Sequence, residues 1–147
     1  MQDEMLAVML STHNEAREEV GVPPLVLDDD LSAQALEYAQ ELADTGRFEH
    51  SAQGDRPGQG ENLWAGTASA FPYEEMSGVW IDEKEFYVHM RFPYVSSTGN
   101  WQDVGHYTQI IWRDTTQLGC GLATGNDRDY LVCRYAPPGN FVGEYAY

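Results

Sequence analysis

The order in which two apolar periodicities follow each other along the chain most constrains how this protein can fold. Apolar residues recur at three-and-four spacing over residues 4–20, from about residue 30 to residue 46, and over residues 73–90, and this spacing is typical of amphipathic helices. Residues 119–124 and 130–135 have instead the pattern of two strands in a hairpin. Helical segments followed by strands predict an α+β fold, with helices packed on a mostly antiparallel sheet.

Helix-breaking residues separate these segments. Gly21 and the Pro-Pro pair shortly after it end the first predicted helix, and the glycine-rich residues 51–60 predict a loop. Residues 106–112 fit a helix and a strand equally well. Because the chain contains no repeat, low-complexity stretch or linker, residues 1–147 are predicted to form a single domain.

The charge balance excludes several classes of partner. The chain has 24 Asp and Glu residues against 8 Lys and Arg residues, which gives a net charge of −16 at pH 7. A surface this acidic repels nucleic acid and anionic membranes, whereas it favours the binding of cations. No segment has the length and apolarity of a membrane span. We therefore expect neither a nucleic-acid partner nor a membrane-spanning helix.

The two cysteines, Cys120 and Cys133, lie in the two predicted hairpin strands, on either side of a turn at residues 125–127. In that arrangement they could face each other as a disulfide, which would suit an exported protein. Two small buried thiols fit the same spacing. The sequence positions alone leave both states open.

Four side chains supply the groups of a candidate site. His106 lies in the apolar and aromatic segment GHYTQIIW, and His50, Glu61 and Glu83 each have an apolar residue two positions away. Imidazole binds zinc and other divalent metals, and carboxylates can complete or orient such a site. The helical spacing His-Glu-x-x-His is absent, so the fold would have to bring the four together. Spacing alone favours the plainer interpretation, in which the glutamates only hold the histidines by hydrogen bonds.

Other catalytic chemistries have less support. Glu61 and Glu83 would act as acid and base on a glycosidic bond only if the fold set their separation. Ser51 adjoins His50, but sequence neighbours seldom form a nucleophile–base pair, and the Gly-x-Ser-x-Gly elbow is absent. Both cysteines lie in apolar, strand-like segments that disfavour a reactive thiolate. The residues alone assign no enzyme class.

The remaining histidines and the tryptophans fit structural roles. His13 falls on the apolar stripe of the first predicted helix, so we expect it to be buried with a partner, while His89 is expected at the surface. An aromatic-lined groove would suit an apolar ligand or a sugar ring. Core packing is nevertheless favoured for at least two of the four tryptophans, which are Trp64, Trp80, Trp101 and Trp112.

Five motifs follow one another in an order known from one protein family. Residues 13–25 (HNEAREEVGVPPL) have the pattern of its first helix and exit, and residues 60–63 (GENL) and 80–83 (WIDE) that of its two glutamate motifs. Residues 105–115 (GHYTQIIWRDT) and 130–140 (YLVCRYAPPGN) match its two signatures. The chain thus resembles the CAP superfamily (cysteine-rich secretory proteins, antigen 5 and pathogenesis-related 1 proteins) over nearly its whole length, as a stand-alone, bacterial-like domain.

This resemblance implies an α-β-α sandwich with a cleft formed by a tetrad of side chains. The tetrad residues are His50, Glu61, Glu83 and His106. Of these, the two histidines would be the direct ligands of a divalent metal such as zinc or magnesium. Because most members are exported, the resemblance also implies an extracellular protein whose leader has been removed, and it favours a disulfide between Cys120 and Cys133.

Three functions follow from the resemblance. The first is a secreted protein whose metal-binding cleft holds an extracellular ligand, which would be a small molecule, a lipid or a polymer. The second is a metal-dependent peptidase or other hydrolase, with Glu61 and Glu83 as catalytic residues. The third is a sterol- or fatty-acid-binding protein that uses apolar surface away from the tetrad. With only two cysteines in the chain, ion-channel regulation is not expected.

Overall fold

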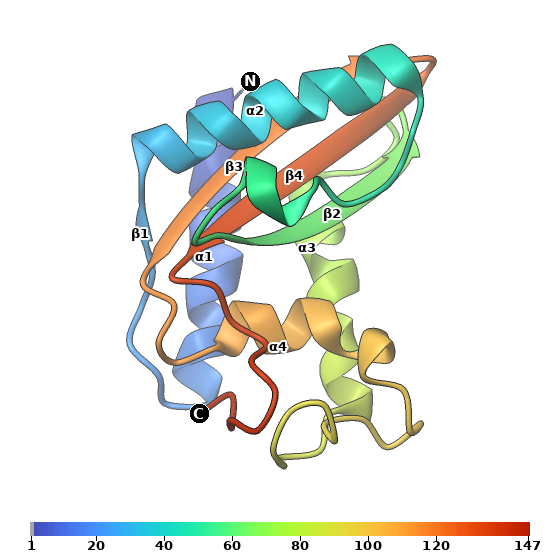
Figure 1. Ribbon diagram of the computed structural model, residues 1–147. Helices are drawn as coiled ribbons and strands as arrows, with labels where there is room; N and C mark the ends of the chain where they lie inside the picture. The colour runs from blue at the N-terminus through green and yellow to red at the C-terminus, as the bar shows by residue number, and fades with distance from the viewer. Residues whose placement is uncertain (1) are drawn as a thin grey trace.

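Helices cover both faces of a four-stranded sheet in the computed structural model, which describes residues 2–147 (Figure 1). β3 pairs antiparallel with β4, and β4 pairs antiparallel with β2, whereas the short β1 runs parallel to β3. The predicted α-β-α sandwich is therefore confirmed, with a sheet that is mixed rather than purely antiparallel. In sheet order the strands are β1 (Val26–Leu27), β3 (Gln117–Gly125), β4 (Arg128–Ala136) and β2 (Gly60–Thr67).

Helix α2 packs on β3 and β4 from one face, while α1, α3 and α4 contact one another on the opposite face. The first two predicted helices are confirmed to within two residues, and the ambiguous segment 106–112 is helical. Asp28 caps α2, because its carboxylate accepts a hydrogen bond from the Leu31 N–H, and Gly46 ends it at φ 73°. Among residues 2–147, no helix combines the length and apolarity needed to cross a bilayer. The helices are α1 (Gln2–Glu19), α2 (Asp29–Thr45), α3 (Tyr73–Ile81) and α4 (Gly105–Ile111).

The third predicted helix is wrong in its second half. Helix α3 ends at Ile81, the next residues form the 3₁₀ turn η2 (Asp82–Phe86), and the backbone is extended at Tyr87. Val79 was expected on the same buried face as Trp80, but it is 55% exposed, because adjacent residues of a helix point about 100° apart and Trp80 takes the core side. Met90, at the end of the predicted apolar spacing, is 50% exposed. A 3₁₀ turn has three residues per turn instead of 3.6, so apolar spacing carried past Ile81 no longer marks one face.

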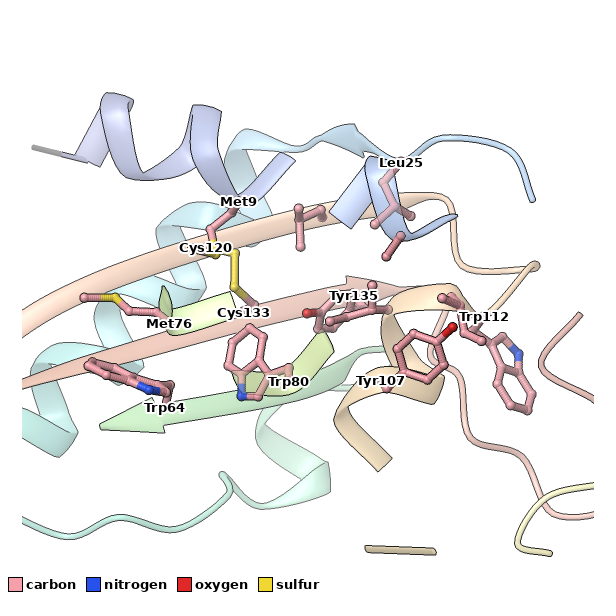
Figure 2. Packing of buried hydrophobic residues seen from close by; sticks show 14 of the residues in the cluster. Met9, Leu25, Trp64, Met76, Trp80, Tyr107, Trp112, Cys120, Cys133 and Tyr135 are labelled. Carbon is pink, nitrogen blue, oxygen red and sulfur yellow. A yellow bond between two sulfur atoms is a disulfide. The ribbon is translucent and has the colours of Figure 1, made fainter. Parts of the chain in front are cut away.

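The two faces of the sheet bury different kinds of residue. On the α2 face, glycines of β3 allow the helix backbone to approach closely: a Cβ atom on Gly121 would lie 2.2 Å from the Cα of Leu36. The other face buries aromatic and sulfur-containing side chains, among them Trp80, which lies beside the disulfide in Figure 2. The disulfide joins Cys120 and Cys133, which are directly opposite in the β3–β4 ladder. It resolves the choice that the spacing had left open.

Arg17, on α1, ties that helix to the end of α4. Its side chain is only 1% exposed, yet it is not neutralised by a carboxylate within the described residues. Instead, its guanidinium donates to the carbonyl oxygens of Ile110 (2.9 Å), Trp112 (2.8 Å), Thr115 (3.0 Å) and Pro23 (2.7 Å). These acceptors include carbonyls that the end of a helix leaves unpaired, where the helix dipole favours a positive charge.

Candidate functional site

A cleft of about 640 Å³ opens where the start of β2 meets the first turn of α4. His50, Glu61 and His106 line it, so the structure brings three of the four predicted tetrad residues to one cleft. Glu83 contacts His106 and lines a separate hollow of about 450 Å³. Apart from the tetrad residues, the cleft is lined by Gln53, Arg56, Gln59, Gly60, Asn62, Trp101, Gln102, Gly105, Gln109, Pro138, Gly139, Asn140 and Phe141.

Strand β2 serves both sides of this cleft because successive side chains of a strand point to opposite faces. Glu61 holds His50, and the neighbouring Asn62 reaches α4 on the other face of the sheet. The Asn62 amide nitrogen donates to the His106 carbonyl (3.1 Å) and to the Tyr135 hydroxyl (3.1 Å). Two consecutive residues of one strand therefore set the position of both histidines.

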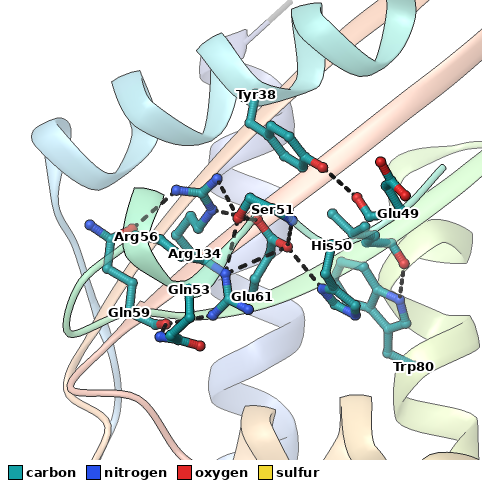
Figure 3. Close-up of polar contacts among 11 residues, drawn as sticks. Tyr38, Glu49, His50, Ser51, Gln53, Arg56, Gln59, Glu61, Trp80 and Arg134 are labelled. Carbon is teal, nitrogen blue, oxygen red and sulfur yellow. Dashed lines mark hydrogen bonds and ion pairs between the residues drawn. The ribbon is translucent and has the colours of Figure 1, made fainter. Parts of the chain in front are cut away.

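The carboxylate of Glu61 is saturated with hydrogen bonds (Figure 3). Its Oε1 accepts from His50 Nδ1 (2.8 Å) and from the Ser51 backbone N–H (3.0 Å). Its Oε2 accepts from the Ser51 hydroxyl (2.8 Å) and from Arg134 Nε (2.8 Å). The Glu61 side chain is 0% exposed, so no face of the carboxylate is left for a ligand.

The electrostatic surroundings keep Glu61 ionised. Burial by itself would raise the pKa of Glu61, but the hydrogen bonds from His50 and Ser51, together with the charge of Arg134, outweigh burial and lower the pKa to about 2. An ionised carboxylate only accepts hydrogen bonds, so His50 must donate its Nδ1 proton. In the neutral imidazole, the lone pair then lies on Nε2 of a ring that is 54% exposed.

His106 also donates from Nδ1 to a carboxylate, but its ring is held in place by different neighbours. Glu83 Oε2 accepts from His106 Nδ1 (2.7 Å), and Glu83 Oε1 accepts from the Tyr107 backbone N–H (3.0 Å). The ring of Trp80 stacks on the His106 ring at 5.8 Å and 13°, and the Trp80 indole donates to the Leu63 carbonyl (3.1 Å). His106 is 32% exposed, so its Nε2 is also presented from a fixed ring.

Sequence reasoning missed the residues that hold Glu61. Arg134 lies opposite Glu61 in the β2–β4 register, is 3% exposed, and also donates to the side-chain oxygen of Gln59 (3.2 Å). Arg56 donates from Nε to the Ser51 hydroxyl (3.0 Å). One signal was present in the sequence: an arginine between Cys133 and Tyr135 interrupts an apolar strand, and a buried arginine requires a partner.

The other histidines lie outside the cleft. His13 is buried as predicted, and its Nε2 pairs with the Tyr135 hydroxyl (2.7 Å), but its Nδ1 has no hydrogen-bond partner among the described residues. His89 is exposed, as predicted, and stacks on Tyr147 at 4.2 Å. Of the four tryptophans, only Trp101 is exposed, and it lines the cleft.

The donor set fits a divalent cation only in part. Within residues 2–147, no three His, Cys, Asp or Glu side chains are grouped so that they could hold a metal ion. The two cleft histidines nevertheless have the arrangement common among metal ligands, in which one ring nitrogen donates to a carboxylate and the other remains free. The described part of the chain thus offers two imidazole nitrogens along one cleft and no third grouped His, Cys, Asp or Glu side chain.

Comparison with known proteins assigns the chain to a family. The sequence model of the cysteine-rich secretory protein family (CAP) matches residues 10–135. The chain belongs to the CAP family. Pathogenesis-related protein 1A of Nicotiana tabacum is 39% identical over 140 residues, which cover 94% of this chain and 78% of that protein.

Two further comparisons, one with a human protein and one with a solved structure, agree with this assignment. The Golgi-associated plant pathogenesis-related protein 1 of Homo sapiens is 36% identical over 138 residues, which cover 92% of this CAP chain and 84% of that protein. The crystal structure of NaASP2 with Zn²⁺ aligns with a TM-score of 0.85 at 27% identity, over 100% of this chain and 86% of that one. The family expected from the five motifs is thereby confirmed.

Proposed function

We propose that this CAP domain is an extracellular binding module whose cleft holds a divalent cation through Nε2 of His50 and of His106. The observation that carries the proposal is that both imidazoles line one cleft, with Nδ1 of each fixed by a carboxylate. A cation bound there would attract oxygen atoms of a ligand. With only two protein donors, the cation would exchange readily, and its remaining positions would be filled by water or by the ligand.

The chemistry of the donors favours zinc over magnesium. Zn²⁺ binds imidazole nitrogen well, whereas Mg²⁺ prefers oxygen ligands in octahedral geometry. The cleft carboxylate, Glu61, has no free oxygen face for Mg²⁺ because four donors already occupy it. The similarity to NaASP2, whose crystal structure contains Zn²⁺, supports the same choice.

A binding role has more support than hydrolysis. A general base must accept a proton near neutral pH, and a carboxyl group with a pKa of about 2 is a poor acceptor there. Both carboxylates also bind the Nδ1 atoms of the histidines and neighbouring backbone N–H groups. Glu61 and Glu83 therefore fit the role of orienting the imidazoles better than that of catalysing a reaction.

An extracellular location fits the disulfide between Cys120 and Cys133, because disulfides persist mainly in oxidising compartments. The secretory character of the CAP family supports the same location. Lipid binding receives less support, since the cluster of buried apolar residues around Trp80 and Ile110 belongs to the packed core.

Titration with Zn²⁺, followed by calorimetry and by histidine NMR signals, tests the proposal. We expect the Nε2 signals of His50 and His106 to shift together, and we expect His50→Ala and His106→Ala each to weaken Zn²⁺ binding by about ten-fold or more. His89→Ala is the matched control, because His89 is exposed and lines no part of the cleft. Equal Zn²⁺ affinity in the parent protein and in His106→Ala would refute the assignment.

A further inference from the structure

The charge of the cleft differs from that of the rest of the molecule. The chain carries 24 acidic and 8 basic residues, yet only two charged side chains, Glu61 and Arg56, line the cleft, aside from its histidines. These two lie 3.8 Å apart, and the Arg56 guanidinium is further bound to Ser51 and to the Gln59 carbonyl. The cleft therefore offers an incoming ligand no unpaired acidic or basic side chain.

The uncharged lining of the cleft is rich in amides. Gln53, Gln59, Asn62, Gln102, Gln109 and Asn140 all contribute to it. Five of the six already hydrogen-bond within the protein, but an amide has two N–H donors and an oxygen with two lone pairs, so part of this capacity can still meet hydroxyl groups. The side chain of Gln102 makes no hydrogen bond to another described residue, and its residue is exposed, so its full donor and acceptor capacity faces outward.

Two exposed aromatic rings lie among these amides. Trp101 is 39% exposed and Phe141 is 46% exposed, although both residue types are usually buried. Trp101 is held from behind: Phe92 packs on it at 5.1 Å, and a Cβ on Gly105 would lie 2.8 Å from its ring. Asn140 positions the segment before Phe141 by donating to the Gly105 carbonyl (3.0 Å) and accepting from the Thr108 hydroxyl (2.7 Å).

We propose that the ligand of this cleft is a neutral sugar, held by stacking on Trp101 and Phe141 and by hydrogen bonds to cleft amides such as Gln102. This inference deepens the proposed function and rests on it, since it names the ligand class of the same cleft. The aliphatic C–H face of a sugar ring packs on the electron-rich face of an aromatic ring, while its hydroxyls meet the amides. The volume, about 640 Å³, is within the range of small-ligand sites, roughly 300–1,000 Å³.

Other ligand classes fit less well. An anionic polysaccharide would be repelled by the net charge of −16, and it would find no free cation in the cleft lining. A cationic ligand would find no free carboxylate there, because the Glu61 oxygens are fully used. A lipid chain would cover the side chain of Gln102, which makes no hydrogen bond to another described residue, and would leave its donors and acceptor unpaired, which is costly.

Binding of cellohexaose, laminarihexaose and mannohexaose, measured by calorimetry and by backbone and side-chain NMR, tests the proposal. At least one of these neutral hexasaccharides should shift the Trp101 indole and Gln102 amide signals. Trp101→Ala should weaken binding by about ten-fold, and Gln102→Ala should weaken it by about three-fold without disturbing a packed core. Tyr94→Ala is the matched control, because Tyr94 is 75% exposed and does not line the cleft.

The outcomes separate this inference from the metal proposal. Saccharide binding that persists in EDTA and is lost in Trp101→Ala supports the sugar site even if the histidines fail to bind Zn²⁺. Zn²⁺ binding by the histidines, without saccharide-induced shifts at Trp101 or Gln102, overturns the sugar site and leaves the metal proposal standing. Equal loss in Tyr94→Ala, or binding of a heparin hexasaccharide in place of the neutral ones, also overturns it.

Discussion

Both cleft histidines are oriented by a carboxylate at Nδ1, but different parts of the two pairs are held rigid. On the His50 side, the carboxylate is rigid, since four donors hold a fully buried Glu61, while the imidazole itself is 54% exposed. On the His106 side, the imidazole is held by stacking on Trp80, while the carboxylate of Glu83 is 16% exposed and sits on a 3₁₀ turn. Fixing either the ring or its carboxylate is enough to keep the Nδ1 proton in place. The protein fixes the carboxylate at His50 and the ring at His106.

If the His50 side depends on a rigid carboxylate, removing Arg134 should have the largest effect on stability. Arg134→Met leaves the buried charge of Glu61 without its closest ion-pair partner, which should lower the free energy of unfolding by about 3–5 kcal/mol. Urea unfolding at pH 7 measures this loss. Lys84→Met is the control, since its ion pair with Glu19 is half-exposed and should contribute about 0–1 kcal/mol. Similar losses of unfolding free energy in the two variants would show that Glu61 is not held by a buried ion pair.

His13 differs from both cleft histidines because it pairs with the hydroxyl of Tyr135 instead of a carboxylate. Burial is the main cause that lowers the pKa of His13 to about 4, and the charge of Arg17 adds a smaller effect in the same direction. The unfolded chain therefore takes up a proton at a higher pH than the folded chain does. The stability that neutral His13 contributes is complete above pH 6.5 and is lost as the pH falls towards 4, by about 3 kcal/mol.

The pH dependence of urea unfolding in the parent protein and in His13→Gln measures this contribution. The difference in unfolding free energy between the two proteins should change by about 3 kcal/mol between pH 7 and pH 4. Glutamine can still bond the Tyr135 hydroxyl but does not titrate. A constant difference over this pH range would show that His13 is not held neutral by burial.

The smallest expected effect compares the two carboxylates directly. Glu61→Gln removes the charge that meets Arg134 inside the protein, and should lower the unfolding free energy by about 2–3 kcal/mol. Glu83→Gln keeps an oxygen for the Tyr107 N–H at a more exposed position, and should lower it by about 1 kcal/mol. Urea unfolding of both variants gives the two values. A larger loss for Glu83→Gln would reverse the assignment of the rigid carboxylate.

Much of the fold follows from local sequence signals. The apolar stripes of α1 and α2 and the turn at Asn126 and Asp127 lie where the patterns predict. Strand β2 was not identified as a strand because Gly60, Glu61 and Asn62 are polar or small yet buried, so the strand shows no alternation. The end of α3 was missed because the change to a 3₁₀ turn leaves no helix-breaking residue in the sequence.

The site was less predictable than the fold. Motif resemblance named His50, Glu61, Glu83 and His106, and spacing alone would not have grouped them. Arg134 was overlooked because its role depends on strand register, which places it opposite Glu61 from 73 positions away. The position of Trp101 in the cleft also depends on tertiary packing, since it is set by Phe92 and by the absence of a side chain at Gly105.

The contacts of Arg17 link one wall of the cleft to a helix that does not line it. This side chain on α1 secures carbonyls 93 to 98 positions later, at and just beyond the helix that carries His106. That wall of the cleft therefore depends on α1 as well as on residues 110–115, and these contacts can form only after synthesis has passed Thr115. Proteolytic removal of α1 should therefore disturb this wall of the cleft from a distance, although α1 contributes no residue to the cleft lining.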